Sequence, residues 1–201
     1  MAKIKASALR FPIKAVLREK ESNAKMSAVI RPMAASDLEH WKEWPFTGED
    51  QDTSWEWDKI LKESRRRGSP IECYALLTGD RLQGLVSLDT AGHSAGEGRA
   101  LVVDYVSSNP ANRRGPDAVK DVGRVFIGFA VHRSKELGFE GRLWLESLSN
   151  AETFYDRIGF AKLPGRSKEG HVTYELGTTL ANAIWQGMRD DKTIDLPDER
   201  T

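Results

Sequence analysis

One candidate site lies where an apolar strand pattern gives way to a helix. The stretch from Ala100 to Val106 is apolar on both faces except at Asp104, and a helical pattern begins near Val122. Such a junction directs free backbone N–H groups and the positive end of a helix dipole toward one point, which would suit a pyrophosphate. Gly123 would let the ligand approach the backbone. Local positive charge comes from Arg113, Arg114, Lys120 and Arg124. The alternative is an ordinary connection with solvated charges.

A second candidate is the segment 151–160, in which two aromatic residues precede a glycine. The pattern predicts a short helix that Ser149 or Asn150 caps and Gly159 ends. The residues expected to face inward are Ala151, Phe154 and Ile158. On its own, the segment is best explained as an amphipathic helix with a tyrosine beside its core face.

Alternating strand and helix patterns surround these segments. Strands are expected at 28–33, 71–77, 82–89, 100–106, 143–145 and 172–176, with a hairpin turn at 78–81 and a loop at 91–98. Helices are expected after N-caps at Ser36 and at Thr53 or Ser54. A third helix is expected to begin near Val122 and to end at Gly138. The order of strand, two helices, three strands, helix, strand, helix and strand predicts an α/β (α+β layered) architecture.

Composition excludes several classes of protein. The 201 residues include 30 basic and 30 acidic residues, so the formal net charge is zero. This balance removes the strongest argument for nonspecific binding to nucleic acid or to an anionic membrane. No apolar run approaches the ~18 residues of a membrane-spanning helix, and the N-terminus lacks the apolar core of a signal peptide. The single Cys73 cannot form an internal disulfide. We therefore expect a soluble, cytoplasmic protein with one main core.

Three segments, in the right order, resemble the GNAT N-acetyltransferase superfamily. The run AETFYDRIGF at 151–160 is similar to the family's A-x-x-FY-x-x-x-GF motif. Val-Gly at 122–123 opens a helix that ends in Leu-Gly-Phe at 137–139, and this resembles the acetyl-CoA motif and its helix. Ile-Arg-Pro at 30–32 followed by Asp37 resembles the family's first strand and helix.

The resemblance covers about residues 28–176 and implies both a fold and an activity. The fold would be a mixed, mostly antiparallel sheet flanked by helices, in which two parallel strands splay apart near 106–108 and Leu145. The activity would be acetyl-CoA-dependent N-acetylation of a primary amine by direct attack on the thioester. Acetyl-CoA would be the co-substrate, no metal would be needed, and the acceptor would be a small-molecule or protein amine.

The same resemblance implies roles for particular residues. Those implied to hold acetyl-CoA are Val106, Ser107, Ser108, Arg113, Arg114, Lys120, Val122, Gly123, Arg124, Asn150 and Phe154. Tyr155 would be the general acid for the departing CoA thiolate. The attacking amine must lose a proton to a carboxylate or to water. Asp104 and Glu146 are the candidate bases, although Asp104 could equally be a buried structural acid and Glu146 a surface residue.

The phosphate loop departs from the family's pattern at Ala118 and Asp121, and Asp121 brings a negative charge close to the expected pyrophosphate. The segment with Arg113 and Arg114 would replace the missing arginine. These departures motivate an alternative function, a catalytically weak or inactive GNAT-fold module that binds CoA or a protein partner. A nucleic-acid-directed acyltransferase is a third reading, which the neutral charge disfavours.

Tryptophans and histidines offer weaker signals. Trp41, Trp44, Trp55 and Trp57 could wall an acceptor pocket or simply pack the first two helices together. His93, His132 and His171 lack the company of other metal-ligating residues, so we expect no metal site. The helical spacing places His132 on the surface.

The two ends lie outside the family pattern. Residues 1–27 are predicted to form an N-terminal arm with an edge strand or hairpin, before the domain at 28–176. Residues 177–201 are predicted to form a short helix and a polar tail. We do not expect nucleic acid or a membrane as a partner, and the sequence leaves a homodimer open.

Overall fold

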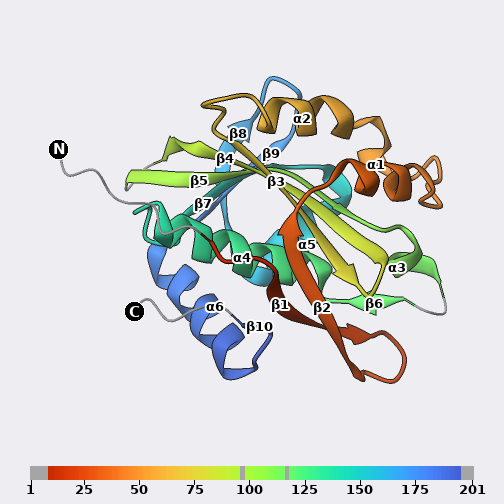
Figure 1. Ribbon diagram of the computed structural model, residues 1–201. Helices are drawn as coiled ribbons and strands as arrows, with labels where there is room; N and C mark the ends of the chain where they lie inside the picture. The colour runs from red at the N-terminus through yellow and green to blue at the C-terminus, as the bar shows by residue number, and fades with distance from the viewer. Residues whose placement is uncertain (1–8, 96–97, 116–117, 196–201) are drawn as a thin grey trace.

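The strands of this chain build one sheet with helices on both faces (Figure 1). The structure, a computed structural model, describes residues 9–95, 98–115 and 118–195. Across these ranges ten strands lie in the order β10-β1-β2-β3-β4-β5-β7-β9-β8, and β6 pairs with β1. The strands are β1 (Ile13–Glu19), β2 (Lys25–Pro32), β3 (Ile71–Thr78), β4 (Arg81–Ala95), β5 (Gly98–Ser108), β6 (Val119–Lys120), β7 (Leu143–Ser147), β8 (Ala161–Arg166), β9 (Val172–Leu176) and β10 (Ile194–Asp195).

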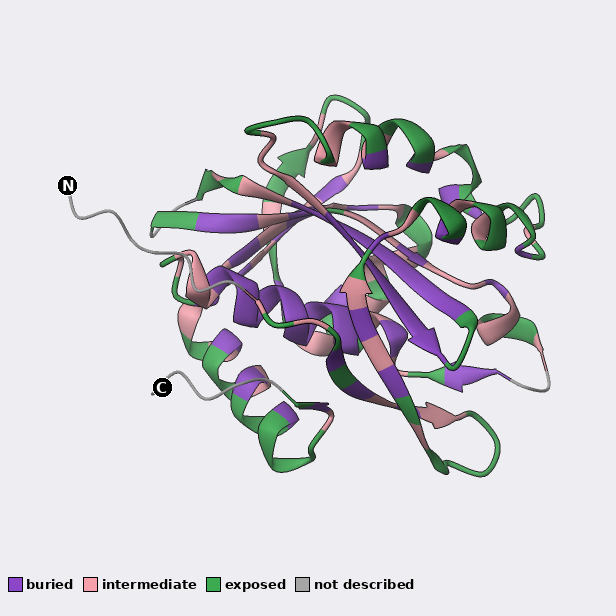
Figure 2. Ribbon diagram, viewed as in Figure 1, coloured by how far each residue is buried: buried purple, intermediate pink, exposed green. Residues whose placement is uncertain are grey.

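The helices divide between the two faces of the sheet. They are α1 (Ala35–Lys42), α2 (Trp57–Ser64), α3 (Ala111–Arg114), α4 (Val122–Glu136), α5 (Glu152–Ile158) and α6 (Thr178–Asp190), with 3-10 turns η1 (Gln51–Ser54) and η2 (Ser149–Ala151). Alternate residues of β3 enter two separate cores, Tyr74 beneath α4 and Ala75 beneath α1 and α2. Helix α4 is buried along most of its length (Figure 2), because the sheet lies on one side of it and α6 on another.

The single parallel strand pair in the described sheet opens into a gap. Strands β5 and β7 pair only at Leu101 with Leu143 and at Val102 with Trp144, yet β5 continues to Ser108. All other described strand pairs are antiparallel. The prediction of a mixed, mostly antiparallel sheet with a splayed parallel pair is therefore confirmed.

A β-bulge lies at the start of this gap. Tyr105 pairs with Ser87 on β4 and Val103 pairs with Leu88, so Asp104 is an extra residue between two consecutive pairs. A bulge re-aims a side chain and bends its strand. The bend helps to turn β5 away from β7 where Asp104 lies.

Glycines end the two helices that follow the splayed strands, as predicted. Gly138 after α4 has a φ of 79° and Gly159 after α5 has a φ of 96°. This left-handed conformation is strained for other residues and typical of a helix C-terminus.

The predicted helix starts were wrong in three places. Ser36 lies inside α1, whose N-cap is Ala34, because the buried carboxylate of Asp37 accepts a hydrogen bond from the Ala34 N–H at 2.7 Å. Helix α2 begins at Trp57 after Glu56, and the predicted caps at 53–54 belong to η1. Helix α5 begins after Ala151, and the predicted caps at 149–150 lie in η2. In the last two cases, tertiary contacts of the connecting segments decide where the helix starts.

Some expected loops contain strands. Strands β4 and β5 extend through most of 91–98, with 96–97 outside the described residues. The loop between β5 and α4 contains α3 and β6, and β8 follows α5. Strand β8 was missed because most of its residues are exposed, which leaves no apolar alternation to detect.

The first and the last strands of the described residues both join the sheet. Strand β1 pairs with β2 from Ile13 opposite Ile30 to Arg18 opposite Lys25, and β10 pairs with β1. Ile194, which the sequence placed in a polar tail, is only 4% exposed. The boundaries proposed at 27 and 177 stay a prediction.

Helix α6 docks closely against α4. A Cβ at Gly128 would lie 1.7 Å from the Met188 sulfur, so the glycine provides the space for that side chain. The ring of His132 stacks on Trp185 at 5.0 Å. The expectation that His132 is a surface residue was wrong, because α6 covers it and leaves it 3% exposed. None of the described helices is long and apolar enough to cross a membrane.

Candidate active site

Two carboxylates face the gap between the splayed strands. Asp104 occupies the bulge of β5, and Glu146 lies on β7 two residues past its last pair with β5. Asp104 is open to solvent on one side, yet the surrounding protein removes enough water to raise its pKa to about 6, and repulsion from the carboxylates of Asp89 and Glu146 adds to the shift. Glu146 lies 3.8 Å from the ring of His171. Asp104 is therefore mostly ionised at neutral pH and can accept a proton.

Tyr155 lies on the face of the same strands that α4 covers. It is 7% exposed, and its ring packs against Phe154, Phe160 and Tyr174 at 5.1–5.5 Å. Tyr174 pairs with Leu145 on β7, which places Tyr155 next to the splayed strand. Burial raises the pKa of Tyr155 well above its usual value. The hydroxyl therefore stays protonated at neutral pH, as a general acid requires.

The start of α4 is in contact with α5. A Cβ at Gly123 would lie 2.7 Å from the ring of Phe154, so only glycine fits beneath this ring. Val122 beside it is 3% exposed and packs in the core. The structure thus brings together Gly123 and Phe154, which the sequence assigned to the cofactor from two distant segments.

Arg113 and Arg114 both bind a buried carboxylate of the protein. Arg113 Nη1 lies 2.7 Å from Asp50 Oδ1, and Arg114 Nη2 lies 2.6 Å from Asp50 Oδ2. Burial by itself would raise the pKa of Asp50, but hydrogen bonds from Arg114 and Thr47 and the charge of Arg113 outweigh it and lower the pKa to about 2. These arginines therefore hold two loops together, and their predicted role in binding pyrophosphate would require them to share this partner.

The segment Asp50–Asp52, between α1 and α2, contacts both sides of the gap. On the β5 side, the Ser107 hydroxyl donates to the Asp52 carboxylate at 2.5 Å. On the β7 side, Gln51 Nε2 donates to Ser149 Oγ at 3.0 Å, and Oε1 of Gln51 accepts from the backbone N–H of Asn150 at 3.2 Å. The segment thus bridges the ends of the splayed strands. Sequence reasoning missed this bridge, because the acidic residues in a polar loop gave no sign that they would be buried.

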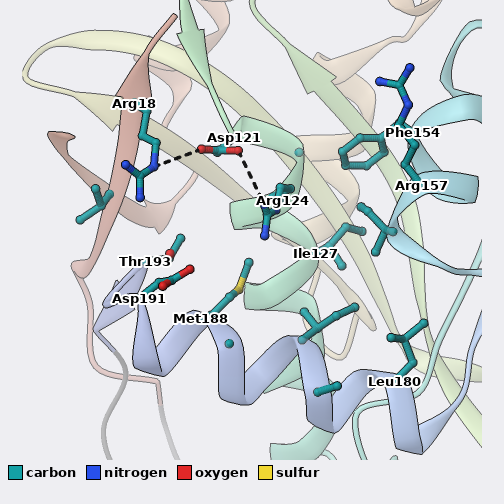
Figure 3. Close-up of a pocket in the computed structure, with 16 residues that line it drawn as sticks. Arg18, Asp121, Arg124, Ile127, Phe154, Arg157, Leu180, Met188, Asp191 and Thr193 are labelled. Carbon is teal, nitrogen blue, oxygen red and sulfur yellow. Dashed lines mark ion pairs between the residues drawn. The ribbon is translucent and has the colours of Figure 1, made fainter. Parts of the chain in front are cut away.

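A cavity of about 790 Å³ extends from the start of α4 across α5 to α6 (Figure 3). Gly123, Arg124 and Phe154 line it, together with Arg18 of β1 and Arg157 of α5. Arg18 and Arg124 each lie 3.9 Å from the carboxylate of Asp121, which is longer than a hydrogen bond. Sequence reasoning missed Arg18 and Arg157, because neither lies in the loop that carried the phosphate signal.

The remaining predicted residues lie around these features. Lys120 is exposed and pairs with Arg18 in the sheet. Val106 is half-buried against the α4 core, and the Ser108 carbonyl accepts a hydrogen bond from Arg113 at 3.2 Å.

The tryptophans mostly pack the core under α1 and α2. Trp44 and Trp57 are buried, while Trp41 and Trp55 are partly exposed. Trp55 contacts Tyr105 at 5.1 Å, immediately beside Asp104. Trp55 is therefore a partly exposed aromatic side chain at the part of β5 that holds Asp104.

The described part of the chain has no group of three or more His, Cys, Asp or Glu side chains arranged to hold a metal ion. That no metal is needed stays a prediction. Cys73 is buried, and burial raises the pKa of its thiol, which makes it unreactive.

Several solved structures of acetyltransferases share this fold. No protein-family model matches the chain, and no curated protein matches it. The KacTA–DNA complex is 23% identical, with a TM-score of 0.52 over 82% of this chain and 99% of that chain. A mutant AtaT toxin bound to the antitoxin AtaR C-terminus and acetyl-CoA is 17% identical, with a TM-score of 0.58 over 79% and 98%. A GNAT-family acetyltransferase from Desulfovibrio desulfuricans is 16% identical, with a TM-score of 0.53 over 75% and 99%.

At these identities the likeness concerns the fold. The protein has the fold of the GNAT acetyltransferases.

Proposed function

We propose that this protein is an acetyl-CoA-dependent N-acetyltransferase that acts on a primary amine. The observation that carries the proposal is the gap between β5 and β7. The carboxylates of Asp104 and Glu146 flank this gap, and the buried hydroxyl of Tyr155 lies on the face that α4 covers. The acetyl thioester would enter the gap, and the backbone N–H groups at 106–108 and 122–124 would hold the pantetheine and the pyrophosphate. A neighbour with this fold binds acetyl-CoA, which supports the choice of donor.

The reaction would proceed by direct transfer. The neutral amine nitrogen attacks the thioester carbonyl carbon, a C–N bond forms, and the C–S bond breaks. Asp104, directly or through a water, takes the proton that the amine loses, and Glu146 is the alternative acceptor. Tyr155 gives its proton to the CoA thiolate. The pKa values fit these roles, since Asp104 is mostly ionised and Tyr155 fully protonated at pH 7.

The test is Tyr155→Phe, which removes one hydroxyl and keeps the ring in its place. We expect kcat for CoA release from acetyl-CoA and an amine panel to fall about 100-fold, the lower range for losing a general acid. Tyr174→Phe is the matched control, because it removes another buried hydroxyl one ring away, the one that binds Asp156 at 2.9 Å. Equal activity of Tyr155→Phe and wild type would remove Tyr155 from the mechanism.

A second candidate is a GNAT-fold module that binds CoA or a partner without turnover. Asp121 in the cavity and the engagement of Arg113 and Arg114 by Asp50 favour it. Calorimetry with acetyl-CoA, combined with the turnover assay, distinguishes the two candidate functions. Binding without CoA release across the amine panel would support the module, and absence of binding at high micromolar ligand would exclude the enzyme.

The neighbours also extend the proposal to partners. One is a toxin bound to its antitoxin and another is part of a complex with DNA, which supports a protein or nucleic-acid partner in addition to the acceptor. Light scattering tests a homodimer first, since self-association would double the 22.5 kDa mass of the chain.

A further inference from the structure

One face of the sheet is partly open to solvent beside the splayed strands. Figure 1 shows α1 and α2 on one side of the sheet and α4 and α6 on the other. Leu101 and Val103 of β5 belong to the core under α4, so Val102 between them lies on the opposite face. Val102 and Trp144 of β7 are only half-buried, although both strands lie inside the sheet. An inner strand covered on both faces would bury both sets of side chains. We call this side of β4, β5, β7 and β9 the open face.

A row of paired residues carries a carboxylate at each end of the open face. Asp89 of β4 pairs with Val102 of β5. Val102 pairs in turn with Trp144 of β7, which pairs with Glu175 of β9. Paired residues on neighbouring strands face the same side of a sheet, so both carboxylates lie on the open face. Three strand spacings separate them, which is roughly 14 Å.

The two carboxylates of the gap extend this row. Asp104 and Glu146 each lie two residues past it along their strands, which keeps them on the same face. Repulsion from Asp89 and Glu146 contributes to the raised pKa of Asp104, so the three carboxylates interact. Asp89, Asp104 and Glu175 form no ion pair with any residue that the structure describes, and Glu146 has only His171 at 3.8 Å. The open face therefore has negative charge that no described lysine or arginine neutralises.

Aromatic rings lie among these carboxylates. Trp144 is in the middle of the row, and the exposed ring of His93 stacks on it at 4.3 Å. Next to Asp104, the ring of Tyr105 contacts that of Trp55 at 5.1 Å. The faces of tryptophan and tyrosine attract cations, and their apolar surface also packs against methylene groups. Carboxylates and rings together match a ligand in which several positive charges are joined by short apolar links.

We propose that the amine acceptor is a linear polyamine, which lies across the open face with its reacting amine at Asp104 and a second ammonium group at Glu175. The proposal rests on the proposed function, because Asp104 takes the proton that the reacting amine loses. Glu175 is the choice for the second ammonium because its carboxylate has no hydrogen bond or ion pair with any described residue, whereas Asp89 already accepts a hydrogen bond from the Ala91 N–H at 2.8 Å.

The row favours a polyamine over a peptide. Its strands are paired where the row crosses them, so this part of the open face offers side chains and no free main-chain groups. An extended peptide gains affinity from main-chain hydrogen bonds at a sheet edge, whereas a polyamine is recognised by charge and methylene contacts alone. Acetylation also turns one terminal ammonium into a neutral amide. The product therefore has one positive charge fewer and should leave the face more readily.

Two amines of equal length test the substrate class on the full chain. Diaminooctane with an amine at each end keeps a second positive charge, whereas octylamine ends in a methyl group. We expect kcat/KM for CoA release from acetyl-CoA to be about tenfold higher with diaminooctane, the effect of one hydrogen bond to a charged group. Spermine, a linear polyamine, should react at least as well as diaminooctane. The preference should shrink in added salt, because salt screens exposed charges.

Two variants remove the charge at either end of the row. Glu175→Gln keeps the size of the side chain, and we expect the preference for diaminooctane to fall to about threefold or less, mainly through a higher KM. A purely structural role would lower kcat for both amines instead. Asp89→Asn should have a smaller effect in the same direction, and its amide oxygen can still accept from Ala91. Glu21→Gln is the matched control, since Glu21 is exposed in the β1–β2 turn, and it should keep the tenfold preference.

The outcomes separate this proposal from the proposed function. Equal kcat/KM for the two amines, or a preference that Glu175→Gln leaves intact, would overturn the polyamine assignment and leave the acetyltransferase proposal standing. Faster transfer to a lysine-containing peptide than to spermine would overturn it in favour of a protein acceptor. Calorimetry with spermine covers the opposite case, because binding of spermine without acetyl transfer would support the open face and contradict the proposed function. If spermine neither binds nor reacts, the assignment fails whether or not another amine is acetylated.

Discussion

Two regions of the molecule gather charged and polar groups, but only one of them provides partners for these groups. The first is the segment 50–52 between α1 and α2, and the second lies between α4, α5 and α6. At the bridge, Asp50 receives both Arg113 and Arg114 within 2.7 Å, and Asp52 receives Ser107. On the α6 side, Arg157 has no ion pair or hydrogen bond with any described residue, and both ring nitrogens of His132 are buried without a hydrogen-bond partner. A saturated cluster stabilises the fold, whereas unsatisfied groups respond to whatever else binds there, a ligand or a proton.

The difference corrects the simplest reading of the sequence. The loop with Arg113, Arg114, Lys120 and Arg124 is locally basic and precedes a helix, so the phosphate prediction was placed there. The structure directs two of these arginines to Asp50. Among the cavity arginines, Arg18 and Arg124 share Asp121 at 3.9 Å, and Arg157 has no ion pair with any described residue. Availability for a ligand follows from the partners a charge already has, and local charge density does not report them.

The largest predicted effect on stability in this comparison concerns His132, on the α6 side. Burial lowers the pKa of His132 from 6.5 to about 4, and the charges of Arg133 and Lys135 add to the shift despite Glu136 at 3.8 Å. Below pH 6.5 the unfolded chain therefore binds a proton that the folded chain does not. Stability is complete above that pH and falls as the pH approaches 4, by about 3 kcal/mol from this group alone.

Urea unfolding at pH 7 and pH 4.5 measures this loss. His132→Phe keeps the ring stacked on Trp185 but cannot titrate, so its stability should fall less than that of wild type over this interval. The exposed His40 serves as the control, and His40→Gln should lose as much as wild type. The same loss in His132→Phe would mean that α6 does not isolate the ring from water.

Asp50→Asn should have the next largest effect, because it breaks the saturated region. The variant keeps the shape of the side chain but removes the carboxylate that Arg113 and Arg114 share, and leaves Arg113 only Asp52 at 3.5 Å. Breaking a fully buried ion pair costs about 3–5 kcal/mol, and the partial exposure of the two arginines reduces this to about 2 kcal/mol. Chemical denaturation provides the measurement. Asp80→Asn, in the exposed β3–β4 turn, is the control and should change stability by less than about 0.5 kcal/mol. Equal losses of stability in the two variants would mean that the ion pairs of Asp50 do not stabilise the fold.

The smallest effect comes from a matched pair of arginine variants. Arg114→Gln removes one of the two arginine partners of Asp50 and should lower the free energy of unfolding by less than Asp50→Asn does. Arg157→Gln removes a charge without a partner in the described chain, so the free energy of unfolding without ligand should stay within about 0.5 kcal/mol of wild type. Thermal melts of both variants measure the two losses of stability. A larger loss for Arg157→Gln than for Arg114→Gln would show that the cavity arginine is a structural group.

Much of the fold follows from local sequence. The doubly apolar run 100–106 marks the central strand, because a strand covered on both faces must be apolar on both. Gly138 and Gly159 mark the helix ends, because only glycine takes the left-handed conformation readily. The exceptions are the helix starts near Asp37 and Asp52, where buried carboxylates use partners from other elements.

The sequence also pointed to the chemical groups of the candidate site, but it did not reveal their burial or their partners. The segment 151–160 pointed to Tyr155, and the strand pattern to Asp104 and Glu146, because each depends on residues close in the chain. Only the tertiary structure placed the bulge at Asp104, covered His132 with Trp185, gave Arg113 and Arg114 to Asp50, and left Arg157 open. Those outcomes depend on partners far away in the sequence. A chain specifies its elements through neighbouring residues, and it decides which of its charges remain free only when the elements pack.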